Sequence, residues 1–343
     1  MSDSSPVKQK AYAEAGVDID LGNRVKSGIH AKVKATHGPE VLGKIGGFGG
    51  LFRPDFSGMT DPVLVSSVDG VGTKLKIAFA MDRHDTVAED LVNHCVDDIA
   101  VIGAKPLFFL DYIGSAKLDP AVFDQMISGF TRACKAAGCA LIGGETAQMP
   151  GMYQPGEYDL AGTIVGVVDR AELLDGSRIS EGDIIIGLAS NGLHTNGYSL
   201  ARKVLLGSGA YQVVDRIDGL ELSLGEELLR VHENYQPLMA ALPKGVLKGA
   251  AHITGGGLVD NLPRVLPKTT DARIDFGSWD IPPLFHLIQT KGNIDALEMF
   301  QVFNMGIGMT LIVSPEDASA VLEQTKGRKI GQIVQGEGKV AIK

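Results

Sequence analysis

The sequence contains few cysteines, and this scarcity excludes several classes of protein. The chain has 343 residues but only three cysteines, Cys95, Cys134 and Cys139. Three cysteines cannot form a fully paired disulfide framework, and their spacing does not match that of a zinc site. A reducing cytoplasm is therefore the expected setting.

Long apolar segments are also missing. No run of 18 or more apolar residues occurs, and the first ten residues, MSDSSPVKQK, contain no apolar signal-peptide core. We expect residues 1–11 to form a loose tail. The sequence predicts neither a membrane span nor a secretory signal.

An excess of positive charge is absent as well. The formal net charge is −9, from 32 Lys and Arg residues against 41 Asp and Glu residues. Nucleic acids and anionic membranes attract basic surfaces, so neither is expected as the main partner. A local basic pocket is still compatible with this balance.

Glycine, by contrast, is abundant and clustered. The 44 glycines are nearly twice the usual share of about 7%. They gather in short groups beside apolar runs: GGFGG (46–50), DGVGTK (69–74), GGETAQMPGM (143–152), SNGLHTNG (190–197), TGGG (254–257) and NMGIG (304–308). Glycine allows the backbone to approach a ligand closely. Six such groups indicate ligand binding more than a fold that merely has many tight turns.

Short apolar runs alternate with helical patterns, which predicts a mixed α/β fold. The expected strands are 62–68, 107–113, 139–143, 159–168, 183–189, 272–276 and 307–313. The expected helices are 87–102, 121–137, 197–206, 225–241, 257–266, 283–290, 295–301 and 315–324. A polar, turn-rich segment at 170–182 predicts a boundary between an N-terminal domain, 12–170, and a C-terminal domain, 171–343.

The helix expected near 86–102 carries an acid in its apolar stripe. That stripe consists of Val87, Leu91, Cys95, Ile99 and Ile102. Asp98 falls within it, whereas Asp97 points to the opposite side. A carboxylate on a buried face needs a partner or a metal ion. We therefore expect Asp98 either to bind a metal or to bond a neighbouring backbone group or a buried lysine, and Asp97 to need no partner.

Asp69 and Lys74 flank a glycine turn directly after an expected strand. Lysine neutralises phosphate, and aspartate holds Mg²⁺ together with substrate oxygens. The spacing matches neither the P-loop nor the G-x-G-x-x-G pattern. Because Asp and Gly are also ordinary turn residues, the turn by itself leaves both interpretations open.

Glu145 follows another expected strand, directly after two glycines. A glutamate here is either an ordinary surface residue or a third acid of a metal site. Together with Asp69 and Asp98 it would complete a Mg²⁺–triphosphate site.

His194 lies between two Asn-Gly turns where a helix is expected to begin, which favours a functional role over a plain surface position. Thr195, Asn196 and Gly197 stand at the start of that helix, and helix N-termini attract anions. The glycines 255–257 open a further expected helix, as a phosphate cradle would. A glycine-rich bend is the alternative for them.

Taken together, the motifs resemble the phosphoribosylformylglycinamidine cyclo-ligases, or AIR synthetases. The resemblance runs from about residue 12 to the end of the chain. It rests on YAEAGVDIDLGN (12–23), GGFGG, DGVGTKLKIA, HDTVAEDLVNHCVDDIAVIGAKPLFFLDYI, GGETAQMPGMY, YDLAGTIVGVV, DGSRISEGD, SNGLHTNGYSL, HITGGGLVDNLPRVLP and FNMGIGM, in the order expected for that family.

The resemblance implies an activity and a fold. A cyclo-ligase uses ATP to close the imidazole ring of formylglycinamidine ribonucleotide, giving 5-aminoimidazole ribonucleotide, ADP and phosphate in purine biosynthesis. The implied fold is α+β. Its N-terminal half, to about residue 170, joins a second subunit in a shared β-barrel, and its C-terminal half is an α/β domain. A homodimer that binds ATP and Mg²⁺ is therefore expected.

The resemblance also implies site residues. Asp69, Asp98 and Glu145 correspond to the Mg²⁺–phosphate acids, and Lys74 to a catalytic phosphate partner. His194 is similar to a histidine proposed to assist catalysis. Further nucleotide contacts are implied for Gly46, Gly47, Gly49, Gly70, Gly72 and Thr73, of which the first three belong to a flap over the nucleotide. Contacts to the substrate phosphate are implied for Thr195, Asn196, Gly197, Gly255, Gly256 and Gly257. His30 stands where the resemblance leads us to expect lysine.

Related activities provide the alternatives. Selenophosphate synthetases carry a reactive Cys or selenocysteine in the N-terminal glycine-rich region, and this chain has no cysteine before Cys95. Thiamine-phosphate kinases share the superfamily, but the motifs at 143–152 and 190–199 fit them poorly. A non-catalytic nucleotide-binding dimer is disfavoured because acids are present at positions 69, 98 and 145.

Overall fold

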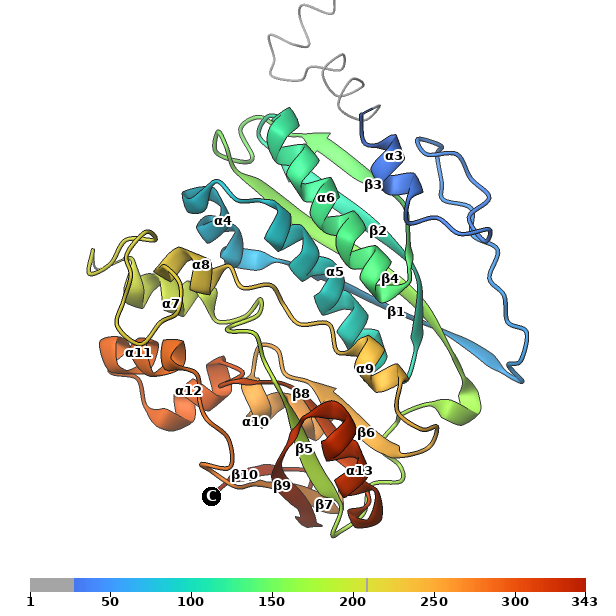
Figure 1. The fold of residues 1–343 in the computed structure, drawn as a ribbon, viewed down its shortest axis with the longest axis vertical. Coiled ribbons are helices and arrows are strands. Elements are labelled where there is room, and N and C mark those ends of the chain that lie inside the picture. The colour runs from blue at the N-terminus through green and yellow to red at the C-terminus, as the bar shows by residue number, and fades with distance from the viewer. Residues whose placement is uncertain (1–27, 208) are drawn as a thin grey trace, which may run out of the picture.

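A computed structural model describes residues 28–207 and 209–343 of the chain. The expected tail, 1–11, and the motif at 12–23 lie outside the described residues. Within them the fold is mixed α/β, as predicted, and is built on two separate sheets. Figure 1 shows the first half of the chain above the second.

The first half forms a four-stranded sheet with helices on one face. Its strands are β1 (Pro62–Gly70), β2 (Lys105–Ser115), β3 (Ala140–Gln148) and β4 (Tyr158–Asp169), in the order β1-β4-β2-β3. Helices α5 (Asp85–Ala100) and α6 (Pro120–Ala137) pack against this sheet and against each other (Figure 1). The shorter elements are α3 (His30–Lys34), η1 (Gly72–Lys74), α4 (Leu75–Met81) and η2 (Arg170–Glu172). His30, the first residue of α3, is exposed to solvent.

The ends of α6 illustrate how local sequence sets an element. The Asp119 side chain accepts hydrogen bonds from the backbone N–H groups of Ala121 and Val122, and Pro120 occupies the first helical position. Gly138 ends the helix with a φ of 67°, a left-handed conformation that glycine adopts without a steric penalty. The sequence therefore fixes both ends of this helix locally.

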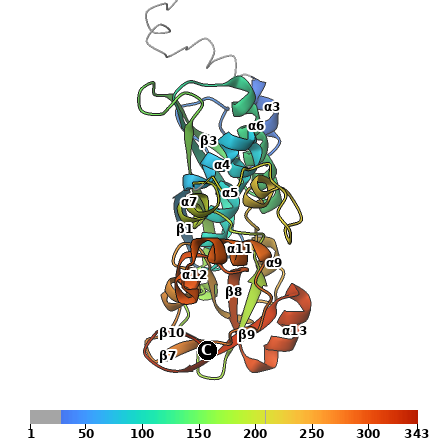
Figure 2. The same cartoon turned by 90° about the vertical axis from the view of Figure 1, so that its left-hand side faces the viewer.

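The second half forms a six-stranded sheet in the order β10-β7-β9-β5-β8-β6. Its strands are β5 (Ile184–Ala189), β6 (Leu247–His252), β7 (Thr270–Ile274), β8 (Ile307–Val313), β9 (Arg328–Gln335) and β10 (Val340–Ile342). Its helices are α7 (Tyr198–Leu205), α8 (Leu224–Leu228), α9 (Gln236–Ala240), α10 (Gly257–Asn261), η3 (Leu262–Arg264), α11 (Pro283–Gly292), α12 (Ala296–Val302) and α13 (Pro315–Thr325). Figure 2 shows α4, α5 and α7 near the level where the two halves meet.

All seven expected strands are present, but β6, β9 and β10 were not predicted. The prediction of a single helix at 225–241 is wrong. The structure has α8 and α9 there, separated by the irregular segment 229–235. This segment gives up helical hydrogen bonds because side chains of α5 bind its backbone, as described below.

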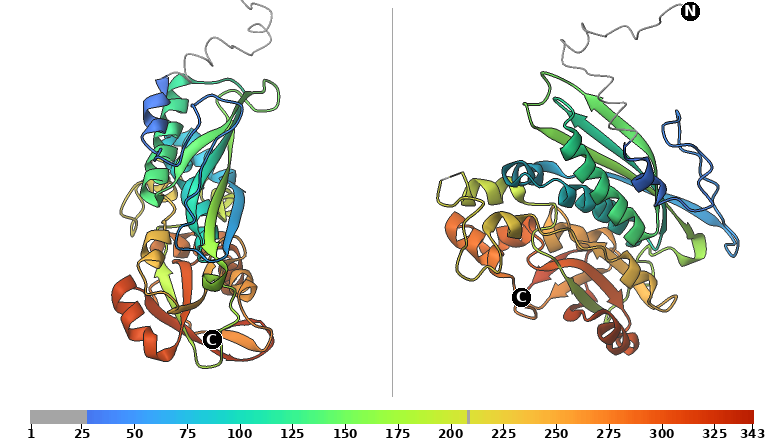
Figure 3. Two further views of the ribbon diagram at one scale, coloured as in Figure 1. Left: turned by 90° about the vertical axis from the view of Figure 1, so that its right-hand side faces the viewer. Right: turned by 45° about the horizontal axis from the view of Figure 1, so that its top comes forward.

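On one face of the four-stranded sheet, strand β1 carries large apolar side chains that the described residues leave mostly exposed. Leu64 and Val68 on β1 point to that face, and 62% and 68% of their surfaces are exposed. The alternating residues Ser67 and Asp69 point the other way, toward α5. Figure 3 shows the first half from its side, with α6 on one side of the sheet. The described residues form no closed barrel by themselves.

Among the described residues, no helix combines the length and apolar character needed to cross a lipid bilayer.

Candidate active site at the junction of the two halves

Helix α5 lies at the centre of the junction, and its polar side chains hold the irregular segment 229–235. Asp90 accepts a hydrogen bond of 2.7 Å from the backbone N–H of His232, and Asp97 accepts one of 2.9 Å from Tyr235. The Asn93 amide donates to the His232 carbonyl over 2.7 Å. These bonds satisfy backbone groups that a continuous helix would have paired internally.

The sequence assigned the wrong exposure to the two neighbouring acids on α5. Asp97 is fully buried, and burial raises its pKa well above the ordinary value. Asp98 is 27% exposed and contacts Ser67 and His252. The amphipathic pattern failed because α5 is covered on both sides, by the sheet and by the second half of the chain. Asp98 does have polar partners, but they are Ser67 and His252 rather than the backbone group or buried lysine that was expected.

A buried ion pair joins α5 to η1. The Lys74 ammonium and Asp90 lie 2.7 Å apart, and both side chains are fully buried. Burial lowers the pKa of Lys74 and raises the pKa of Asp90 to about 6. Lys74 also donates to the backbone carbonyls of His194, over 3.0 Å, and Arg230, over 2.7 Å. One ammonium group therefore ties three distant segments together.

A continuous chain of hydrogen bonds, the histidine relay, links two acids at this junction. It begins at Asp69, ends at Asp98, and passes through His94, Thr195, His232 and His252. The successive distances are 2.8 Å, 2.7 Å, 3.4 Å, 2.9 Å and 2.9 Å. The relay combines residues from β1, α5, β6 and two loops of the second half.

Counting protons defines the charge of the relay. Each of its five hydrogen bonds requires one proton, whereas three neutral imidazoles and one hydroxyl supply only four. With Asp69 and Asp98 both ionised, one histidine must therefore be an imidazolium. A second proton on His94, His232 or His252 fills all five bonds in each case, because the Thr195 hydroxyl can donate toward either neighbour. The surroundings of the three histidines therefore decide which one is charged.

The local environments place that proton on His94. Burial alone would lower the pKa of His94, but its hydrogen bond to Asp69 and the charges of Asp98 and Asp69 outweigh burial and raise it. Burial lowers the pKa of His252 in spite of its bond to Asp98. Burial and the neighbouring His and Lys charges lower the pKa of His232 well below its ordinary value. The bonds from His94 and His252 lower the pKa values of Asp69 and Asp98 in spite of burial. Both acids are held as carboxylates.

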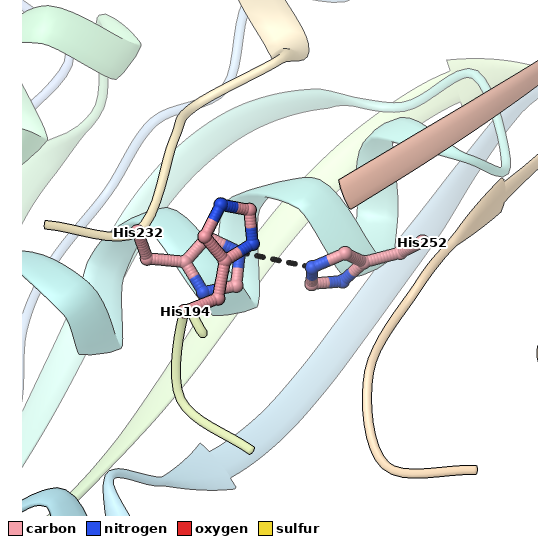
Figure 4. Close-up of side chains that lie close together, drawn as sticks. All are labelled: His194, His232 and His252. Carbon is pink, nitrogen blue, oxygen red and sulfur yellow. Dashed lines mark hydrogen bonds between the residues drawn. The ribbon is translucent and has the colours of Figure 1, made fainter. Parts of the chain in front are cut away.

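His194 lies beside the relay and is held in an unusual conformation. Its ring stacks on that of His232, with centroids 4.0 Å apart, as Figure 4 shows together with the bond from His232 to His252. Its φ of 60° is left-handed, a conformation that costs a residue other than glycine about 1 kcal/mol or more. Nε2 accepts the backbone N–H of Asn191, so the neutral ring carries its proton on Nδ1. Burial lowers the pKa of His194 well below the ordinary value.

A cavity of about 390 Å³ opens beside the Asp98 end of the relay. Ser66, Ser67, Asp98 and His252 line it, as do Thr254 and Arg264 from the second half. The relay therefore ends at a surface that a small molecule can reach.

The acids at the ends of the relay suit a magnesium ion. Asp69 is 41% exposed and Asp98 27%, and the Nε2 atom of His94 lies 2.8 Å from one and 3.9 Å from the other. Mg²⁺ prefers one or two carboxylates with water and phosphate oxygens, and histidines that bond to those carboxylates orient them. His194 and His232 suit a metal poorly, because the nitrogen lone pairs of stacked rings do not converge.

Comparison with known proteins identifies the family. The family model described as AIR synthase related protein, N-terminal domain, matches residues 55–168, and the C-terminal model matches residues 180–343. The phosphoribosylformylglycinamidine cyclo-ligase of Bacillus cytotoxicus is 52% identical over 335 residues, which cover 96% of each chain. That of Nitratidesulfovibrio vulgaris is 52% identical over 340 residues, 97% of each chain. The chain belongs to the phosphoribosylformylglycinamidine cyclo-ligase family.

Solved structures support the fold of this cyclo-ligase family member at lower identity. Thiamine-monophosphate kinase from Stenotrophomonas maltophilia is 19% identical, with a TM-score of 0.65 over 94% of this chain and 95% of that one. The hydrogenase maturation protein HypE in complex with ATP is 16% identical, with a TM-score of 0.67 over 94% and 91%. At these identities the likeness concerns the fold alone.

Glu145 lies apart from the other two predicted metal ligands. In the sheet, Asp69 pairs with Gly162, whereas Glu145 pairs with Tyr112, whose other neighbour is Ala161. Residues paired across neighbouring strands point to the same face of a sheet, and consecutive residues of one strand point to opposite faces. Because Ala161 and Gly162 are consecutive, Glu145 and Asp69 lie on opposite faces. Asp69 faces α5, and Glu145 faces the other side, three strand spacings or about 14 Å across the sheet. One cyclo-ligase chain therefore does not form the predicted three-acid site.

Lys74 is not placed as a phosphate ligand. Its ammonium has three N–H groups, and Asp90 and two carbonyls occupy all of them out of contact with solvent. A phosphate could reach it only by breaking this buried set. The structure therefore gives Lys74 a positioning role through the backbone of His194.

The predicted substrate-phosphate loops meet, but their glycines also have packing roles. A side chain on Gly255 would lie 3.1 Å from the Asn196 amide oxygen, so the two loops are neighbours. A Cβ on Gly197 would lie 2.2 Å from the Phe303 ring, and one on Gly257 would lie 2.0 Å from the Phe300 carbonyl. Gly256 has a φ of 96°. Thr195 is buried in the relay.

The predicted nucleotide glycines lie in two different places. Gly46, Gly47 and Gly49 occupy an exposed loop that is closed at its base by hydrogen bonding between Leu42 and Leu51. Gly70 and Gly72 flank the turn after β1, and the Thr73 hydroxyl contacts that of Ser199 over 3.0 Å. Their role in nucleotide binding stays a prediction.

Sequence reasoning missed four members of the site: His94, His232, His252 and Asp90. His94 stands four residues before Asp98 on the same helix, and this spacing could have indicated the pair. His252 begins the quoted HITGGG motif, but no role was assigned to it. His232 has no local signal, because it lies in a segment that was expected to be helical.

Replacing Lys74 with Met should strongly destabilise the fold. The change leaves the Asp90 carboxylate buried without its partner, which costs about 3–5 kcal/mol of unfolding free energy. Urea unfolding would measure this loss. Lys244→Met, which removes an exposed pair with Glu172, is the control and should cost at most about 1 kcal/mol. Equal, small effects of the two changes would contradict a stabilising role for the buried Lys74–Asp90 ion pair.

Replacing His94 with Gln should remove stability in a pH-dependent way. Because the folded-state pKa of His94 is raised, its contribution is fully present below its unfolded value of about 6.5 and disappears as the pH rises through the folded value. The unfolding free energy of the wild type minus that of the variant should therefore shrink above about pH 6.5. Urea titrations at several pH values would measure it. The exposed His286→Gln is the control, and a difference that grows with pH would refute the assignment.

Proposed function

We propose that this chain uses ATP to close the imidazole ring of formylglycinamidine ribonucleotide, forming 5-aminoimidazole ribonucleotide, ADP and phosphate. The observation that carries the proposal is the 52% identity to curated cyclo-ligases along almost the whole of both chains. The reaction is a ligase step of purine biosynthesis. The junction supplies what such chemistry needs, namely paired carboxylates, a proton relay and an adjoining cavity.

The proposed chemistry activates an amide oxygen. The formyl oxygen attacks the γ-phosphate of ATP, ADP leaves, and the amide nitrogen releases its proton, which gives an imino-phosphate. A nitrogen of the amidine group then attacks the activated carbon, phosphate leaves, and the attacking nitrogen releases a proton. Positioning and charge stabilisation, rather than a protein nucleophile, lower the barrier of such a reaction.

Asp69 and Asp98 are the proposed holders of Mg²⁺. When bound, the ion neutralises charge on the transferred phosphoryl group. His94 and His252 fix the orientation of the two carboxylates through bonds of 2.8 Å and 2.9 Å. Both acids stay ionised at neutral pH, because these contacts lower their pKa values.

The histidine relay can move a proton between its buried end and the cavity. The same five protons can fill its five bonds with His94 charged, or with Asp98 protonated and every histidine neutral. Shifting the four protons between His94 and Asp98 along their own bonds therefore moves the extra proton to the cavity. Because both arrangements fill every bond, the relay can accept the proton that ring closure releases only after it has given up one of its own. No side chain has to move. His194 packs on the relay and lines neither of the cavities described here, so we propose that it orients His232.

A second copy of the chain is the proposed cover for the open face of the sheet. Leu64 and Val68 are large apolar side chains that are mostly exposed on that face. Extended apolar sheet faces are usually covered in a functional assembly. A homodimer whose two sheets form one β-barrel would bury them. The three cysteines of the described chain are free and buried, which agrees with a cytoplasmic enzyme.

Replacing Asp98 with Asn should abolish most of the substrate-dependent turnover. The change removes the negative charge proposed to bind Mg²⁺ and replaces the charge-assisted bond from His252 with a neutral one, so kcat should fall about 100-fold or more. ADP release with Mg·ATP, with and without formylglycinamidine ribonucleotide, would measure it. The control is Asp280→Asn at a 96% exposed position. Full activity of Asp98→Asn would remove Asp98 from the mechanism, and no substrate-dependent ADP release by the wild type would refute the proposed function.

Replacing Leu64 with Lys should dissociate the proposed dimer. A charge placed in a buried apolar interface costs several kcal/mol, enough to shift a dimer at micromolar concentration toward monomer. Sedimentation velocity would measure the change in mass. Leu297→Lys, at a 66% exposed position on α12, is the control. A monomeric wild type, or a Leu64→Lys variant that stays dimeric, would exclude this interface.

A further inference from the structure

A second cavity, of about 570 Å³, lies between α4 and α7 at the junction. Its walls include Lys76 and Phe79 from α4, Ser199, Arg202 and Lys203 from α7, and Glu157. The residues from α7 follow the helical spacing i, i+3, i+4, so one face of that helix lines the cavity. We call this cavity the α4–α7 pocket. None of its residues was singled out in the sequence.

The charge of the α4–α7 pocket is opposite to that of the whole chain. Three cations face one acid, whereas the chain carries a net charge of −9. Lys76 pairs with Glu157 over 2.5 Å. Within the described residues, Arg202 and Lys203 form no ion pair with an acid. Two cations are therefore available to an anionic ligand.

The cavity beside Asp98 has the reverse balance. Asp98 and Asp175 line it with a single cation, Arg264. A phosphate dianion is repelled by that pair of acids unless a metal ion bridges them, whereas the α4–α7 pocket attracts it directly.

The two glycine loops predicted to bind the substrate phosphate carry no positive charge of their own. The six residues predicted to contact the substrate phosphate, 195–197 and 255–257, include no cation. Gly197 and Gly257 are needed for packing against Phe303 and Phe300. Phosphate monoesters in proteins are usually held by charge-assisted hydrogen bonds from Arg or Lys in addition to backbone groups.

The two cavities are neighbours along the chain. Thr254 lines the cavity beside Asp98, and the next residue, Gly255, contacts the loop at Asn196. Three residues after Asn196, Ser199 lines the α4–α7 pocket. The contact between Asn196 and Gly255 thus joins the two loops that lead to the two cavities.

We propose that the α4–α7 pocket binds the 5′-phosphate of the ribonucleotide substrate, with Arg202 and Lys203 as its cationic ligands. The inference rests on the proposed function. It places the phosphate in the basic cavity and the reacting amide beside the acids of the other cavity. The ligand class is a ribose phosphate monoester, and Arg202 is the residue that distinguishes it from the unphosphorylated riboside.

Isothermal titration with ribose 5-phosphate tests the pocket without requiring turnover. Arg202→Gln should weaken binding about tenfold, the usual effect of losing one charge-assisted hydrogen bond. Lys203→Gln should weaken it in the same direction, whereas Arg328→Gln, an exposed arginine on β9, should not. Ribose without phosphate should bind no variant measurably. Thermal melts of the variants should match the wild type, because both side chains lie at the surface.

Steady-state kinetics then identify the source of the phosphate. Arg202→Gln should raise the KM for formylglycinamidine ribonucleotide about tenfold and leave the KM for ATP and kcat near their wild-type values. A raised KM for ATP alone would assign the pocket to the nucleotide and overturn the proposal. Unchanged ribose 5-phosphate binding in both variants would overturn it as well. Weakened binding in an enzyme that never turns over the ribonucleotide would support the pocket while refuting the proposed function.

Discussion

The buried contact between Lys74 and Asp90 is the constraint on which the site depends. Both groups are charged and inaccessible to water, so each is stable there only because the other is present. Lys74 also binds the carbonyls of His194 and Arg230, and Asp90 binds the backbone of His232. Two charges on the first half of the chain thereby fix the loops of the second half that carry His194 and His232.

The histidine relay can form only because this junction is closed. Its members come from both halves, and its five bonds require one proton more than neutral side chains supply. A single proton, held by His94 between Asp69 and Thr195, thus determines the direction of every bond in the relay. The protonation of the relay beside the Asp98 cavity therefore depends on how the two halves pack against each other.

Much of the fold could be predicted from local patterns, because it depends on local hydrogen bonds and alternation. The seven expected strands follow apolar runs, and Asp119 and Gly138 mark both ends of α6. The prediction failed where tertiary contacts replace local ones. Residues 229–235 have a helical pattern but bond to Asp90 and Asp97, and β9 was missed because its pattern is weak and its pairing is nonlocal.

The sequence by itself determined the family, the mixed α/β class and the presence of Asp69 and Asp98 near a site, because motifs and periodicity are properties of neighbouring residues. Only the tertiary structure decided which acids share a face. It placed Glu145 on the side of the sheet opposite Asp69, buried Lys74 against Asp90 and brought His94 and His252 to the two carboxylates. Register and helix packing set these relations, and both depend on residues far apart in the chain.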